Sequence, residues 1–245
     1  MSTYSNTPNQ EVVGLKEKSG MLSFAKVFLY MFFGLAITAA VAFGFGYAFM
    51  AAANNGADPQ ILSNTYFGVM IGSAIALFVM VFVIQFVFFR GKHSVLIPAI
   101  IYCVLMGILL SSFTILLEGN YWLLAMAFGI TSGVFLLMTL IALFTKGNLH
   151  PLWMIGMGLM FGSLILSLVN WLIGSATIGW IVSFALFAAI MFITMFDIWN
   201  IKKICENGQM TPNLELYCAF NLYVDFIYIM IRILYFLIII FGNKR

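Results

Sequence analysis

The chain has 245 residues, of which 64% are hydrophobic and only 8% are charged, and its formal net charge is +3. A soluble globular domain is about half apolar and about a quarter charged. The composition therefore excludes that class and predicts a polytopic membrane protein. No basic patch is interleaved with aromatic residues, so we expect no nucleic-acid partner. The three cysteines form no CxxC pair and are expected to be reduced, packed thiols.

Apolar runs long enough to span a membrane, about 20 residues each, follow one another along the chain. The first six are residues 24–52, 67–89, 95–117, 122–144, 152–174 and 178–200, and the seventh is 215–241. Short polar breaks separate them, which predicts that consecutive helices are antiparallel neighbours. We expect a polar cytoplasmic N-terminal segment at 1–20 and a single seven-helix membrane domain at 21–245.

Lysine and arginine gather in the N-terminal segment and in alternate connections, which predicts a cytoplasmic N-terminus. The intervening connections carry Asp58 and Glu118 instead. Seven crossings would place the C-terminus outside, although two basic residues end the chain. The seventh run is therefore either a full crossing or a re-entrant hairpin. The absence of Gly and Pro between Leu216 and Phe241 favours a crossing. A bacterial plasma membrane is the expected location.

Glycines at small-xxx-small spacing predict close helix packing. They are the pairs Gly68 and Gly72, and Gly158 and Gly162.

A polar stripe marks the seventh run. Its members are Asn221, Asp225, Tyr228, Arg232 and Tyr235. At 100° per residue they fall within an arc of roughly 80° on one helix face. A charge at the centre of a bilayer costs about 2.5–3.5 kcal/mol. The stripe is therefore expected to face the protein interior or a water-filled path.

Asp225 needs a partner from another helix, because Arg232 lies about 10.5 Å away along the helix axis. Asp197, near the end of the sixth run, has a compatible depth. Two close carboxylates in a low dielectric cannot both ionise cheaply and would share a proton. Such a pair is suited to sensing pH and to transient contact with calcium. Two alternatives remain open: Asp197 pairs with Lys202 or Lys203, or Asp225 and Arg232 form a bridged structural pair.

Features of an enzyme are missing from the sequence. The two histidines, His93 and His150, fall in predicted connections, and no GxSxG elbow or nucleotide-binding glycine loop occurs. We expect no enzymatic activity and no cofactor.

Four segments carry a resemblance to a known family. They are FLYMFFGLAITAAVAF, TKGNLHPLWMIGMGLMFGSLILSLVNWL, MFITMFDIWNIKKI and LELYCAFNLYVDFIYIMIRIL. Over roughly residues 24–241 the chain resembles the Bax inhibitor family, also called the transmembrane Bax inhibitor motif family. It departs from the family pattern at Ile198 and Trp199, where Thr-Gln is usual. It also departs in the second helix, which lacks the charges that some bacterial relatives carry.

The resemblance implies an all-α integral membrane protein whose seventh helix is central, with six helices around it. It implies a pH-sensitive calcium leak gated by Asp197 and Asp225, with calcium as the permeant ion. On this view Asn221, Tyr228 and Arg232 line the interior path. An alternative follows from other bacterial relatives, which modulate membrane quality-control proteases. In that case residues 1–20 would contact the protease, and the lipid bilayer would be the other partner.

Overall fold

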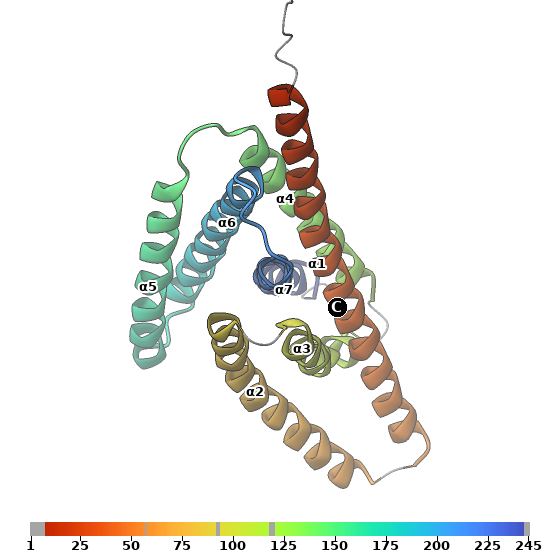
Figure 1. Ribbon diagram of the computed structural model, residues 1–245. Helices are drawn as coiled ribbons and strands as arrows, with labels where there is room; N and C mark the ends of the chain where they lie inside the picture. Colours follow the sequence, from red (N-terminus) through yellow and green to blue (C-terminus); the bar gives the residue numbers. More distant parts are fainter. Residues whose placement is uncertain (1–7, 57, 92–93, 118–120, 243–245) are drawn as a thin grey trace, which may run out of the picture.

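A computed structural model describes residues 8–56, 58–91, 94–117 and 121–242. These residues form the helices α1 (Pro8–Asn54), α2 (Pro59–Arg90), α3 (Leu96–Leu116), α4 (Tyr121–Phe144), α5 (His150–Ile173), α6 (Ala176–Glu206) and α7 (Pro212–Gly242) (Figure 1). Each of the seven contains a span that is long and apolar enough to cross a membrane. The all-α, seven-span class is thereby confirmed. Because α7 is one unbroken helix, the re-entrant hairpin is wrong.

Some helices extend beyond the predicted apolar runs, and for α2 a capping residue fixes the extended end. The α2 helix begins at Pro59, well before residue 67. The Asp58 side chain accepts a hydrogen bond from the Gln60 amide at 2.9 Å, and Pro59 occupies the first turn. The α6 helix continues to Glu206, and α1 already begins at Pro8 inside the predicted polar segment.

The helices do not pack simply in chain order. The α1 helix packs mainly on α3 and also on α7 and α6, and α5 packs on α6. Among the described residues, α1 and α2, α3 and α4, and α4 and α5 make no substantial contact. The prediction of antiparallel sequential neighbours is therefore wrong for these pairs. Figure 1 shows the reason for the first pair: α1 and α2 meet at their connection and then diverge.

Glycine permits close approach at positions other than the predicted ones. A Cβ atom on Gly107 of α3 would lie 2.8 Å from the Thr38 carbonyl oxygen and 2.7 Å from Val41 Cβ of α1. A Cβ atom on Gly156 of α5 would lie 2.8 Å from Ile193 Cγ1 of α6. By contrast, a Cβ atom added to any of the predicted contact glycines would meet nothing within 4 Å: Gly68, Gly72, Gly158 and Gly162. Their predicted packing role is wrong.

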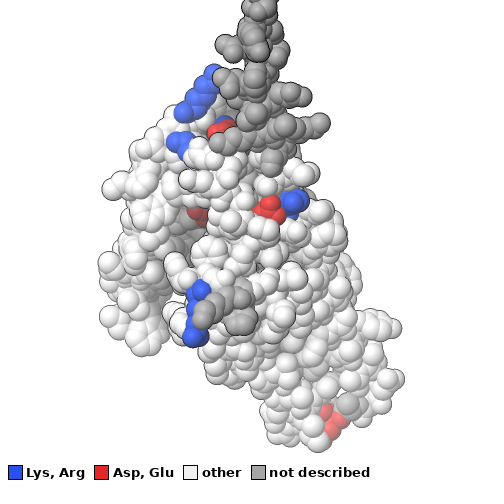
Figure 2. Space-filling model, in the orientation of Figure 1, with Lys and Arg blue, Asp and Glu red and all other residues white. Residues whose placement is uncertain are grey.

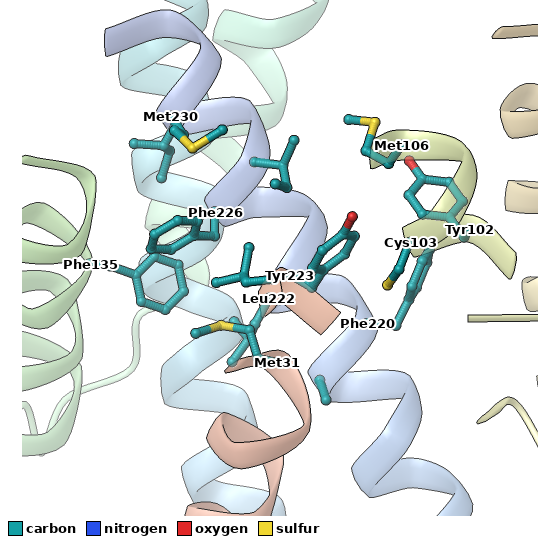
Figure 3. Close-up of a cluster of buried hydrophobic side chains, with 14 of the residues drawn as sticks. Met31, Tyr102, Cys103, Met106, Phe135, Phe220, Leu222, Tyr223, Phe226 and Met230 are labelled. Atoms are coloured by element: carbon teal, nitrogen blue, oxygen red, sulfur yellow. The ribbon is translucent and has the colours of Figure 1, made fainter. Parts of the chain in front are cut away.

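Buried side chains cluster along the middle of α7, whose aromatic side chains reach several neighbouring helices (Figure 3). The Tyr223 hydroxyl lies 2.6 Å from Thr38 Oγ1, which itself donates to the Cys103 carbonyl oxygen at 3.1 Å. This pair of bonds joins α7, α1 and α3. Phe226 packs against Phe135 of α4, with ring centroids 5.6 Å apart. Side-chain packing and this buried polar link therefore help to fix the position of α7.

Candidate functional site

Polar contacts join several helices at the end of the molecule where α7 begins. Lys26 Nζ of α1 lies 3.9 Å from Glu215 Oε1 of α7, and the Glu215 side chain is only 6% exposed. The Val95 amide, just before α3, donates to Asn213 Oδ1 at 2.9 Å. Sequence reasoning missed Glu215, although an acidic residue in the first turn of an apolar helix is a recognisable signal.

Asp197 lies on α6 and is half-buried. The nearby lysines have other partners: Lys202 Nζ lies 3.8 Å from Glu206 Oε1, and Lys203 Nζ lies 3.9 Å from the centre of the Trp199 ring. Neither lysine forms an ion pair with Asp197. The alternative of a helix-end aspartate neutralised by Lys202 or Lys203 is therefore wrong.

Asp225 of α7 lies at the interface with α6. Its polar neighbours on α6 are Asp197 and Thr194. Thr194 is fully buried. Among the described residues, Asp225 Oδ2 is buried without a hydrogen-bond partner. Asp225 thus faces α6 near Asp197 and Thr194, and one of its carboxyl oxygens remains unsatisfied.

The rest of the polar stripe follows a less densely packed side of α7. Asn221 and Arg232 are half-buried, whereas Tyr228 is 47% and Tyr235 46% exposed. The two tyrosines therefore lie outside the packed interior. Arg232 lines a cavity of about 510 Å³, together with residues of α5 and α6. No ion pair joins Arg232 to any carboxylate in the described part of the chain, Asp225 included.

Charged side chains are sparse on the visible surface, which is mostly white in Figure 2. Large apolar side chains such as Phe78, Phe86 and Trp171 are exposed along the helices. This is the surface that a lipid bilayer would cover. Within the described ranges, no group of three or more His, Cys, Asp and Glu side chains is placed to hold a metal ion.

Seven apolar spans with a few buried polar groups between them define a multi-pass integral membrane protein. A family profile described as "Inhibitor of apoptosis-promoting Bax1" matches residues 21–243. The chain therefore belongs to the Bax inhibitor (Bax1-I) family, whose members are membrane proteins and generally not enzymes. The resemblance described from the sequence is confirmed.

The chain is also similar to curated proteins along most or part of its length. Inner membrane protein YbhL of Escherichia coli K12 is 29% identical over 239 residues, covering 94% of this chain and 96% of the relative. YbhL of Escherichia coli O6:H1 strain CFT073 matches with the same values. An uncharacterized protein of Borreliella burgdorferi is 28% identical over 151 residues, covering 60% of this chain and 62% of that protein.

Proposed function

We propose that the protein is a pH-sensitive passive cation leak, suited to calcium, gated by Asp197 and Asp225. The observation that carries this proposal is the unpartnered buried Oδ2 of Asp225 beside Asp197. An unsatisfied carboxyl oxygen at membrane depth is costly, and such groups commonly mark ion or proton paths. Paired carboxylate oxygens are ligands for hard cations such as calcium.

The hydroxyl group beside the pair suggests how a proton closes the path. Thr194 Oγ1 donates its one proton to the Ile190 carbonyl oxygen at 2.8 Å. Among the described residues Asp225 Oδ2 has no hydrogen-bond partner, so a proton shared between Asp197 and Asp225 would supply the missing bond in a closed state.

At higher pH both carboxyl groups would be ionised. Their repulsion across the α6–α7 interface would loosen it, and their combined charge would attract a cation. At lower pH a shared proton would restore the contact and close the path. The leak should therefore increase with pH.

The proposal assigns α7 the central position, with the other helices around it. Contacts of α7 with α1, α2, α4 and α6 support this, as does the edge-to-face contact of Tyr102 of α3 with Phe220. The path would follow the polar stripe of α7, past Asn221, Tyr228 and Arg232. The N-terminus would be cytoplasmic, as the distribution of basic residues predicts.

The test is calcium flux into proteoliposomes from about pH 5 to about pH 8, a range that a shared carboxyl proton can span. We would compare wild type, Asp225→Asn and the matched control Asp58→Asn, which makes the same change at an exposed connection. We expect flux to rise with pH in wild type and control, and to lose its pH dependence in Asp225→Asn. Faster flux at acidic pH, or a wild-type profile in Asp225→Asn, would contradict the proposal.

A second candidate is a modulator of a membrane quality-control protease. It is favoured by one observation: α1 begins at Pro8, ahead of the membrane span that starts at Gly20. This helical extension would contact the protease. Deleting the residues before Gly20 should then abolish regulation and leave any calcium flux intact. An absence of flux from folded wild-type protein would favour this candidate over the leak.

A further inference from the structure

A polar cavity lies where α5 ends, α6 begins and α7 approaches its C-terminal end. Its volume is about 510 Å³. Its polar lining consists of Ser167, Asn170, Ser175, Ser183, Arg232 and Tyr235. The gate proposed above lies elsewhere, about two helical turns from Arg232 toward the N-terminal end of α7.

Arg232 gives this cavity a positive charge. The guanidinium group is always protonated and has five N–H donors. Within the described part of the chain it has no ion-pair partner, and Asp225 lies about 10.5 Å away along the helix. A half-buried guanidinium at membrane depth requires compensation. An anion that accepts its N–H donors in the cavity would provide it.

The start of α6 adds donors on the same side. The cavity is lined by Ser175, Ala176 and Gly179, which form the N-cap and first turn of this 31-residue helix. The Ser175 side chain makes no capping hydrogen bond. The first amide groups of a helix have no intrahelical acceptor, and the helix dipole favours negative charge there. These amides and Arg232 would act on the same ligand.

Asn170 of α5 requires a hydrogen-bond donor from the ligand, whereas Arg232 and the helix amides require acceptors. Among the described residues its Oδ1 is buried without a hydrogen-bond partner. Its Nδ2 lies on the α6 side, 3.5 Å from the position that a Cβ atom on Gly179 would take. A ligand that satisfies the polar groups of the cavity therefore needs acceptor oxygens for Arg232 and the helix amides. It also needs one hydroxyl proton for Asn170.

We propose that this cavity binds a phosphate-type anion that also carries a hydroxyl group. Two sources share this chemistry: hydrogen phosphate from solution, and the phosphate of a hydroxyl-bearing lipid headgroup such as phosphoglycerol. The site stands independently of the proposed leak, because its binding is measured without any flux.

The experiment is a phosphate titration of the full chain, purified in phosphate-free detergent solution. Intrinsic tryptophan fluorescence is the readout, because Trp180 lines the cavity. Wild type is compared with Arg232→Gln and with the matched control Arg90→Gln. The control removes an exposed arginine that lies over the Phe86 ring on α2. We expect saturable binding to wild type and control, weakened about tenfold or more in Arg232→Gln.

A second arm distinguishes the sources. Native mass spectrometry would count phosphatidylglycerol molecules retained after reconstitution in nanodiscs of phosphatidylcholine and phosphatidylglycerol. A lipid retained by wild type and control but lost from Arg232→Gln, without a phosphate response, identifies the headgroup. If wild type, Arg232→Gln and Arg90→Gln show the same phosphate response and retain the same amount of phosphatidylglycerol, the proposal is overturned. If Arg232→Gln does not fold by circular dichroism, Asn170→Leu decides: severalfold weaker binding supports the site, and unchanged binding overturns it.

Discussion

The glycine contacts between α1 and α3 give a sharp test of how the bundle is held together. Replacing Gly107 by Ala would place a methyl group 2.8 Å from the Thr38 carbonyl oxygen and 2.7 Å from Val41 Cβ. Both atoms belong to the backbone or to a branched Cβ, so neither can move without shifting α1 itself. The substitution should therefore separate the two helices and strain the buried link from Thr38 to Cys103 and Tyr223.

Overpacking of this kind costs about 1–3 kcal/mol. The matched control is Gly158→Ala on α5, where the added methyl group would meet nothing within 4 Å. There the gain in helix propensity, at most about 1 kcal/mol, leaves stability unchanged or slightly higher. The same chemical change is thus expected to lower stability at Gly107 and not to lower it at Gly158.

The measurement is unfolding in mixed micelles with increasing SDS, followed by tryptophan fluorescence. Gly107→Ala should unfold at a lower SDS fraction than wild type, and Gly158→Ala at the same or a higher fraction. Equal midpoints for the two variants would refute the assigned α1–α3 contact. A loss of stability in Gly158→Ala alone would refute the assigned open face of α5.

Two further substitutions test the buried polar contacts of α7 by the same unfolding assay. Tyr223→Phe removes the hydroxyl group 2.6 Å from Thr38 Oγ1 and should cost about 0.6 kcal/mol, the average for hydrogen bonds between membrane helices; a variant as stable as wild type would show that this bond contributes nothing. Lys26→Gln should lower the free energy of unfolding by about 1–3 kcal/mol, because it leaves the 6%-exposed Glu215 carboxylate without its cation. Glu215→Gln should lower it less. The double variant should recover part of that loss, and an additive double variant would contradict the ion pair.

The positions of the spans could be predicted from the sequence because each requires only a long apolar run. The limits of the helices could not be found in that way. The first residues of α2 are too polar to belong to the apolar run, yet Asp58 and Pro59 start the helix there. The Asp-Pro pair is a recognisable sign of a helix start, but a hydropathy profile alone does not detect it. The lateral order of the helices was not predictable, because it depends on which glycines face another backbone, as Gly107 does and Gly158 does not.

The candidate site was predictable in part for a similar reason. Asp197 and Asp225 stand out because any charge in an apolar run needs an explanation, and helical spacing gives their approximate depth. The lysine alternative could be decided only in three dimensions, where Lys203 lies over Trp199. The cavity at Arg232 was also out of reach, since it is formed by the junction of α5 and α6, and no sequence spacing relates that junction to α7.

The proposed leak places a cation at Asp225, and the proposed cavity site places an anion beside Arg232 on the same face of α7. The electrostatic energies between these charges decide whether the two proposals are compatible. At about 10.5 Å and an effective dielectric constant of about 20, the Arg232 charge opposes a unit positive charge at Asp225 by about 1.6 kcal/mol. The opposition is about twice as large for a divalent cation. A single negative charge bound beside Arg232 would cancel most of it. An anion in the cavity would therefore remove the main electrostatic objection to a cation path along a stripe that contains an arginine.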